Sequence, residues 1–131
     1  MMNRYFQEIL DAHDLICCWL SDVRSPTQVC EELLTRFSPA YSMVTPDGAQ
    51  LNYTSLTSFF QAQCGAKPGL KIKIDNMRLI TESEVGACVT YQERQQLPGQ
   101  RSTLRFSTVV FELGKGDQVI WRHLHETAQP L

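Results

Sequence analysis

One stretch near the C-terminus decides the fold: Val119-Ile120-Trp121-Arg122-His123-Leu124-His125-Glu126-Thr127. Its side chains alternate in size and polarity, and no Gly or Pro interrupts them, which predicts a β-strand. Successive residues of a strand point to opposite faces. The alternation places the odd-numbered residues, among them Trp121, His123 and His125, on one face. The even-numbered residues, which include Glu126, then lie on the other face.

Upstream of this strand the sequence predicts three helices. Apolar residues at i, i+3, i+4 and i+7 predict the first over residues 4–23, and His13 lies on its buried stripe. Ser25 is expected to cap the second helix in a capping box completed by Gln28. The third runs from about 54 to 63, capped by Thr54 or Asn52.

Strands make up most of the remaining sequence. A short strand is expected over 41–44, followed after the third helix by strands over 70–79, 85–96 and 101–113. The apolar parity switches near Asp75-Asn76, which indicates a bulge or bend. Helices followed by strands in antiparallel meander predict an α+β fold, and a length of 131 residues predicts one domain over 1–131.

Composition excludes several classes of function. The formal net charge of −2 gives no electrostatic basis for binding nucleic acid. No apolar run reaches the roughly 18 residues of a membrane helix, and the N-terminus lacks a signal peptide, so we expect a cytoplasmic protein that binds no membrane. The five cysteines show no CxxC spacing and are expected to be reduced apolar residues.

The strand over 104–113 is apolar on both faces. Leu104, Phe106 and Val110 share one face, and Val109 and Phe111 share the other. Helices can cover only one face of the sheet, so a second copy of the chain is the expected cover for the other. This pattern predicts a homodimer through the sheet face.

Three segments resemble the nuclear transport factor 2-like superfamily, a conical fold of three N-terminal helices packed on a strongly bent antiparallel meander sheet. They lie within 36–48, 87–93 and 107–127. The chain resembles small bacterial stand-alone SnoaL-like members of unassigned activity. The resemblance implies a cavity between the helices and the concave sheet, while the fold itself hosts many functions.

The last two segments are also similar to the association domain of calcium/calmodulin-dependent protein kinase II. In that domain an alanine-cysteine-aliphatic-x-tyrosine strand precedes a terminal tryptophan and histidine strand. The corresponding residues here are Ala87-Cys88-Val89-Thr90-Tyr91 and the stretch from Trp121 to His125. Glu93 and Val109 stand where two pocket arginines of that domain would align.

Glu93 is the first candidate site residue. If the hairpin loop that follows has an odd number of residues, Glu93 lies opposite or near Arg105. On a solvated surface this pair would contribute only about 0.2–1 kcal/mol. At the mouth of a cavity, burial would raise the pKa of Glu93 and Arg105 would lower it.

His123 and His125 are the other catalytic candidates, since either could exchange a proton with Glu93. Structural hydrogen bonding at the cavity wall or dimer contact is the alternative. Together they could also offer two metal ligands, with a third from His13, Glu93 or Asp75. A two-ligand motif is too weak for a metal site, so no metal and no cofactor is expected.

An apolar cavity would draw its polar groups from several strands. We expect a ligand to contact Tyr41, Tyr91, Glu93, Arg105, Trp121, His123 and His125, with His13 as a further donor. Three functions fit: binding of a small molecule, acid-base catalysis of the isomerase, dehydratase or cyclase kind with Tyr91 as the oxyanion donor, or homo-oligomerisation and protein interaction.

Overall fold

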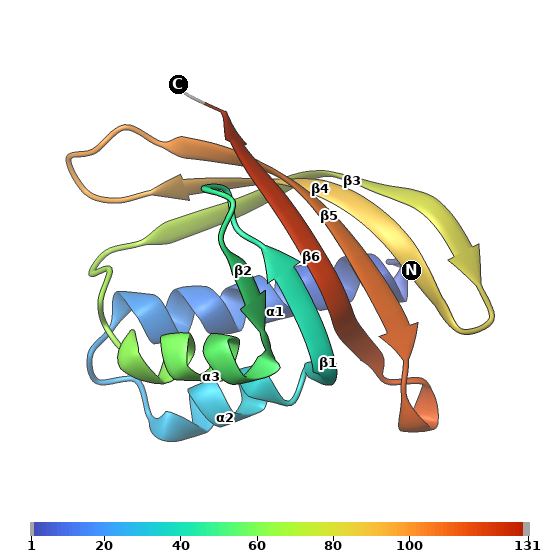
Figure 1. Cartoon of the computed structure of the whole chain (residues 1–131). Helices are drawn as coiled ribbons and strands as arrows, with labels where there is room; N and C mark the ends of the chain where they lie inside the picture. Colours follow the sequence, from blue (N-terminus) through green and yellow to red (C-terminus); the bar gives the residue numbers. More distant parts are fainter. Residues whose placement is uncertain (1, 130–131) are drawn as a thin grey trace.

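The computed structural model describes residues 2–129. Three helices pack on one face of a strongly curved six-stranded sheet (Figure 1). The helices are α1 (Arg4–Ser21), α2 (Thr27–Leu34) and α3 (Tyr53–Ala62). The strands are β1 (Phe37–Val44), β2 (Gln50–Asn52), β3 (Lys71–Ser83), β4 (Gly86–Gln96), β5 (Thr103–Leu113) and β6 (Val119–Gln129), with a 3-10 turn, η1 (Lys115–Asp117), before β6. The α+β class and conical fold expected from the sequence are confirmed.

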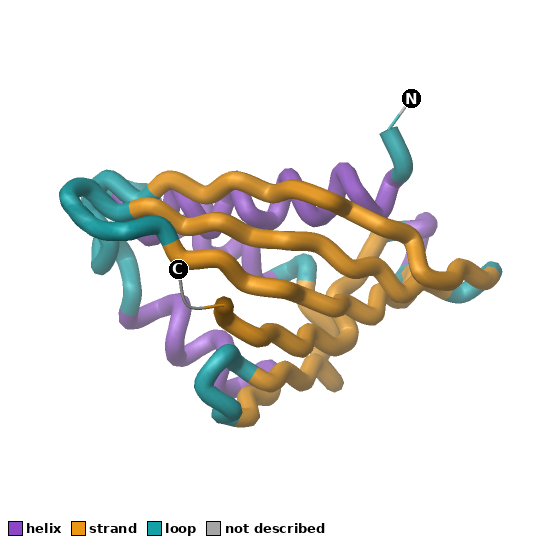
Figure 2. The backbone as a smooth tube through the Cα atoms, turned by 90° about the horizontal axis from the view of Figure 1, so that it is seen from above, coloured by secondary structure: helices purple, strands orange, loops and turns teal. Residues whose placement is uncertain are grey.

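The strand order is β2-β1-β6-β5-β4-β3. Strands β3 to β6 form the expected antiparallel meander. β1 pairs with β6 in parallel, so the sheet as a whole is mixed, whereas the sequence predicted only its antiparallel meander. β1 and β6 can pair in parallel because no hairpin joins them: a helix and the strands of the meander lie between them in the chain. Figure 2 shows the strands as one curved layer with the helices on its concave side.

Local sequence signals set most element boundaries. The Asn52 side chain accepts from the Ser55 amide (2.9 Å) and caps α3 in a capping box, as one of the two expected caps. The expected Ser25 cap of α2 is wrong, because the Ser25 hydroxyl instead donates to the Cys18 carbonyl (2.7 Å). That bond ties the start of α2 to the end of α1.

The bend of β3 lies where the sequence parity changes. The β3–β4 register shifts between Asp75 and Arg78, and Asn76 takes a φ of 55°. Asn is one of the residues that tolerate this left-handed conformation. The bulge is therefore confirmed, and it curves the long strand around α1.

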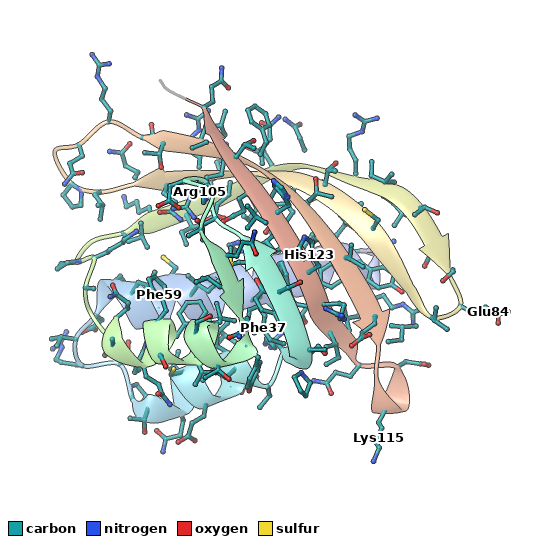
Figure 3. All side chains as sticks on the ribbon, viewed as in Figure 1. Phe37, Phe59, Glu84, Arg105, Lys115 and His123 are labelled. Atoms are coloured by element: carbon teal, nitrogen blue, oxygen red, sulfur yellow. The ribbon has the colours of Figure 1, made fainter. Side chains whose placement is uncertain are left out.

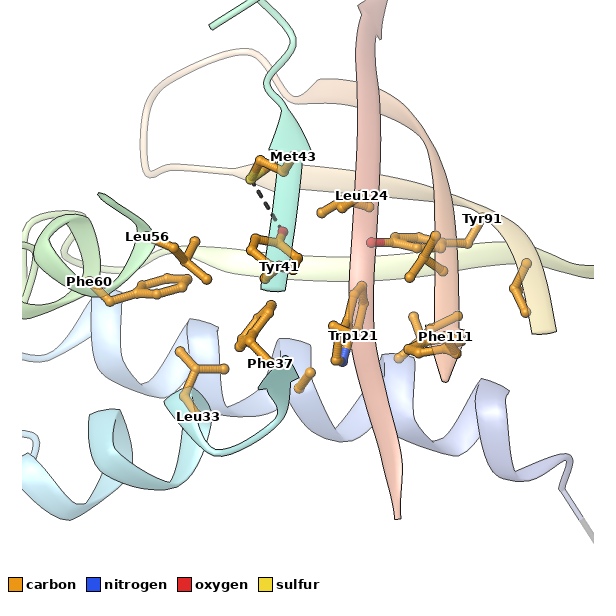
Figure 4. Packing of buried hydrophobic residues seen from close by; sticks show 14 of the residues in the cluster. Leu33, Phe37, Tyr41, Met43, Leu56, Phe60, Tyr91, Phe111, Trp121 and Leu124 are labelled. Atoms are coloured by element: carbon orange, nitrogen blue, oxygen red, sulfur yellow. Dashed lines mark hydrogen bonds between the residues drawn. The ribbon is translucent and has the colours of Figure 1, made fainter. Parts of the chain in front are cut away.

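The core lies between the helices and the concave face (Figure 4). Large aromatic side chains dominate it: Tyr5, Phe37, Phe60, Tyr91, Phe111 and Trp121 are all buried. Phe111 and Trp121 pack edge to face with ring centroids 4.9 Å apart. Among residues 2–129 no helix is long and apolar enough to cross a membrane.

Candidate functional site

A cavity of about 400 Å³ opens between the helices and the concave sheet. Its walls are mainly aromatic and aliphatic, and Phe37, Tyr41 and Trp121 form part of them (Figure 4). Phe59 on α3 and Arg105 on β5 also line it and lie on the same side of the molecule (Figure 3). This combination of apolar walls and a few polar groups is typical of small-molecule sites.

Strand alternation brings the polar side chains into the cavity. Tyr91 and Glu93 are two residues apart on β4, so both point inward. Glu93 pairs directly with Arg105 on β5, which confirms the register expected for this hairpin. Ser107 is opposite Tyr91 on one side and opposite Glu126 of β6 on the other.

His13 and Glu93 form a buried pair across 80 residues of sequence, with His13 Nε2 3.1 Å from Glu93 Oε1. His13 Nδ1 lies 2.7 Å from the Ile9 carbonyl oxygen. Both ring nitrogens therefore face oxygen acceptors, and only the doubly protonated ring can donate to both. The two side chains are 7% and 4% exposed, so the ion pair is shielded from solvent.

The pair holds Glu93 ionised. Burial alone would raise the pKa of Glu93, but the His13 charge and hydrogen bonds from His13 and Gln95 lower it to about 2. Gln95 Nε2 donates to Glu93 Oε2 at 2.6 Å. Burial alone would lower the pKa of His13, and Glu93 outweighs it and raises the pKa. A carboxylate in this state is a weak proton acceptor.

Glu126 is the second buried carboxyl group of the cavity, 4% exposed. Ser107 Oγ donates to Glu126 Oε2 at 3.1 Å, and an Arg105 nitrogen lies 3.4 Å from Glu126 Oε1. Glu93 also has two such contacts, but one of them is shorter, at 2.6 Å. Burial and then the negative charge of Glu93 raise the pKa of Glu126, against the opposite effect of Arg105. The surroundings of the two carboxyl groups thus shift their pKa values in opposite directions because their partners differ.

Two tyrosine hydroxyls reach the same space. The Tyr91 hydroxyl is buried and has no hydrogen-bond partner within 3.5 Å among the described residues, although Ser107 lies near enough to oppose the rise in its pKa. Burial, and then the Glu93 charge, raise the pKa of Tyr91 well above its usual value, so the hydroxyl keeps its proton and can donate. Tyr41 contacts the Met43 sulfur at 3.4 Å, and burial raises its pKa as well.

Trp121 forms part of the inner end of the cavity and is held by the helices. Its Nε1 donates to Glu8 Oε2 on α1 at 3.0 Å. Glu8 Oε1 in turn accepts from Arg36 at 2.6 Å. The indole is therefore held by a hydrogen bond at its nitrogen and by ring packing against Phe111.

The expectation that Trp121, His123 and His125 share a face is wrong. Val110 pairs with His123 and Phe111 pairs with Trp121, so Arg122 is an extra residue in β6. This bulge reverses the parity of the strand. Trp121 and Glu126 face the cavity, whereas His123 and His125 lie on the outer face.

The outer face keeps the two histidines side by side, with ring centroids 6.5 Å apart. The Ser42 hydroxyl lies 2.7 Å from His123 Nδ1, and His125 borders a shallow outer groove beside Phe106. Neither histidine reaches Glu93, so the sequence-based hypothesis of proton exchange between them has no geometric basis. Asp75 is at the bend of β3, where its Oδ2 lies 3.8 Å from Lys73. Within residues 2–129 no group of three or more His, Cys, Asp or Glu side chains is arranged to hold a metal ion.

Of the sequence-predicted ligand contacts, the cavity brings together His13, Tyr41, Tyr91, Glu93, Arg105 and Trp121. Three residues of the site were not predicted from the sequence: Glu126, Ser107 and Gln95. Glu126 was assigned to the opposite face because the bulge was not foreseen. Gln95 could have been predicted, because it lies on the same face of the same strand as Tyr91 and Glu93.

Comparison with solved structures gives close and distant relatives. An NTF-2 like protein of unknown function from Pseudomonas aeruginosa is 36% identical, with a TM-score of 0.90 over 96% of this chain and 98% of that one. An NTF2-like protein from Cytophaga hutchinsonii is 13% identical, with a TM-score of 0.70 over 98% of this chain and 100% of that one. The CaMKII hub homology domain of Chlamydomonas reinhardtii is 16% identical, with a TM-score of 0.71 over 98% and 100% of the two chains. No protein-family model matches the sequence, and no curated protein matches it.

Proposed function

The chain belongs to the nuclear transport factor 2-like family, and we propose that it binds an uncharged small molecule in the cavity between its helices and sheet. The fold is consistent with ligand binding or with oligomerisation. The observation that carries the proposal is an apolar cavity of about 400 Å³ into which a buried, unbonded Tyr91 hydroxyl is directed. A buried hydroxyl without a partner costs about 1–3 kcal/mol, which a bound acceptor would recover.

Charge balance favours an uncharged ligand. His13 is paired with Glu93, and Arg105 with Glu126, so the inner cavity presents two cations and two carboxyl groups. Lys67 and Asp47, which also line the cavity, add one charge of each sign, so the walls carry no net charge. Beside the two buried pairs, a charged ligand would have to separate one of them or remain unpaired. The ligand we propose has an apolar body and one oxygen that accepts a hydrogen bond from Tyr91.

The test uses two probes that differ only in that oxygen, 2-acetylnaphthalene and 2-ethylnaphthalene, measured by isothermal titration calorimetry. Tyr91→Phe should lower the affinity for 2-acetylnaphthalene about tenfold, because one hydrogen bond contributes about 0.5–1.5 kcal/mol. The affinity for 2-ethylnaphthalene should stay unchanged.

Tyr5→Phe is the matched control, since the Tyr5 hydroxyl is also buried without a partner but Tyr5 does not line the cavity. It should leave both affinities unchanged. Absence of saturable binding by either probe, or equal effects of the two substitutions, would contradict the proposal.

Acid-base catalysis of the isomerase, dehydratase or cyclase kind is a second candidate use of the same cavity. It is favoured by one observation, the presence of two carboxyl groups whose surroundings move their pKa values in opposite directions. In such a reaction Glu126 would exchange the proton, because Glu93 is held ionised by His13.

Self-association is a third candidate, for the outer face. Phe106 and Val110 point away from the cavity and are 42% and 40% exposed, on a central strand of the sheet. We propose that a second copy covers them, as the strand pattern led us to expect. Light scattering at micromolar concentration should give a dimer, and a monomer would contradict this proposal.

A further inference from the structure

We propose that filling of the cavity is coupled to uptake of one proton by Glu126. The empty cavity holds the Glu126 carboxylate beside Arg105 and water, and the occupied cavity holds Glu126 as the neutral acid. This inference rests on the proposed binding function and deepens it, because it assigns the proton-exchanging residue and makes affinity depend on pH.

The two carboxyl groups of the cavity differ in how well their charge is compensated. Glu93 accepts from His13 at 3.1 Å and from Gln95 at 2.6 Å, one on each oxygen. Glu126 has a hydroxyl at 3.1 Å and a single guanidinium nitrogen at 3.4 Å, the latter beyond the usual length of a charge-assisted bond. Glu126 therefore depends more on solvent for the stability of its charge.

The groups that face Glu126 come from four elements, and they compensate its charge only in part. From β4, Glu93 repels its charge, and the Tyr91 phenol is neutral. From α1, the His13 charge is compensated by Glu93. From β1, Tyr41 is neutral. From β5, Arg105 and the Ser107 hydroxyl stabilise the Glu126 carboxylate, both through long contacts.

Arg105 is the part of this pair that solvent can reach, since its side chain is 27% exposed and lines the cavity, whereas that of Glu126 is 4% exposed. An apolar ligand replaces the water that solvates the Arg105–Glu126 pair. Loss of water disfavours the charged form of a carboxyl group. Glu126 then takes a proton from the solvent, its carboxylate becoming a carboxylic acid, while Ser107 can turn its hydroxyl to remain hydrogen-bonded.

The sign of the pH dependence follows directly. The ligand prefers the protein with protonated Glu126, so affinity for an uncharged probe rises as pH falls. It reaches a plateau below the pKa of Glu126 in the empty cavity, and a second, weaker plateau above its pKa in the occupied cavity. Each unit by which the ligand raises this pKa corresponds to about a tenfold change in affinity.

The experiment is calorimetric titration of the full chain with 2-acetylnaphthalene, a probe with no ionisable group, between pH 5.5 and 8.5. At each pH, buffers of different ionisation enthalpy report the number of protons taken up. We expect the protein to take up close to one proton for each probe molecule bound. The affinity should be about tenfold higher at pH 5.5 than at pH 8.5.

Glu126→Gln should remove both the proton uptake and the pH dependence while still binding the probe. His125→Ala, a control histidine on the outer face, should retain both. Should Glu126→Gln fail to fold, carbon-13 NMR of the Glu126 carboxyl group in the unsubstituted protein gives the same answer, since its titration should move to higher pH when the probe is added.

The outcomes separate the two proposals. Binding without proton uptake, proton uptake that persists in Glu126→Gln, or an unchanged Glu126 titration overturns the coupling and leaves the binding function in place. No binding of the probe at any pH overturns the binding function itself.

Discussion

The two faces of the sheet use the same residue types in opposite ways. On the inner face, His13 meets Glu93 in a buried pair and both its ring nitrogens are bonded. On the outer face, His123 and His125 lie side by side next to exposed apolar residues of β5, and within residues 2–129 neither forms an ion pair with a carboxylate. The difference shows that chemistry in this fold depends on which face of the sheet a side chain occupies, and hence on strand register.

Removing a histidine from each face should give the largest contrast. His13→Ala leaves Glu93 buried without its cation and should lower the free energy of unfolding by about 3–5 kcal/mol. His125→Ala removes an exposed side chain and should change it by less than about 0.5 kcal/mol. Urea unfolding at pH 7 measures both, and equal losses would refute the distinction between the faces.

The two inner carboxyl groups should respond differently to neutralisation. Glu93→Gln leaves His13 without a counter-charge and should cost about 3 kcal/mol or more. Glu126→Gln removes a charge that burial and Glu93 disfavour, so stability at pH 7.5 should rise by up to about 1 kcal/mol. Urea unfolding of the two variants side by side is the check, and a large loss for Glu126→Gln would show that Arg105 compensates its charge after all.

Stability should depend on pH through the same groups. Glu93, with its pKa lowered from 4.5 to about 2, contributes stability above pH 4.5 that is lost as the pH falls toward 2. His13, with its pKa raised from 6.5, contributes stability below pH 6.5 that is lost as the pH rises through its folded value. Because both shifts describe one pair, we expect a single stability maximum between about pH 4.5 and 6.5, flattened in His13→Ala. Thermal unfolding across pH 3 to 9 tests this, and an unchanged profile in the variant would argue against the pair.

The outer face should respond through assembly rather than folding. Val110→Lys places a charge on an exposed apolar position and should convert the proposed dimer to a monomer with little change in helix and strand content. Light scattering and circular dichroism measure the two properties. Thr108→Lys, a polar neighbour on the same face of β5, is a milder comparison, and a smaller effect is expected from it.

Most parts of the structure that depend on neighbouring residues followed from the sequence, with the Ser25 cap of α2 as an exception. The α+β class, the bend near Asp75-Asn76 and the Asn52 cap rest on signals within a few residues. The pairing of Glu93 with Arg105 was predicted on the condition that the hairpin loop has an odd number of residues, because loop length fixes the register, and the structure meets that condition.

The parts that depend on distant contacts did not follow. The stretch 119–127 has apolar residues on both parities, so nothing in it reveals the extra residue at Arg122. The bulge is defined by pairing with β5 and β1, and one residue of slip exchanges the two faces. The His13–Glu93 pair joins residues 80 apart, which no local pattern could indicate.

The most direct test of the account is a map of the binding site by two-dimensional NMR during titration with 2-acetylnaphthalene. The account predicts that the largest shift changes occur at the backbone amides of Tyr91 and Glu93 and at the Trp121 indole, with His123 and His125 little affected. Changes confined to His123, His125 and the exposed residues of β5 would place the site on the outer face and contradict the account.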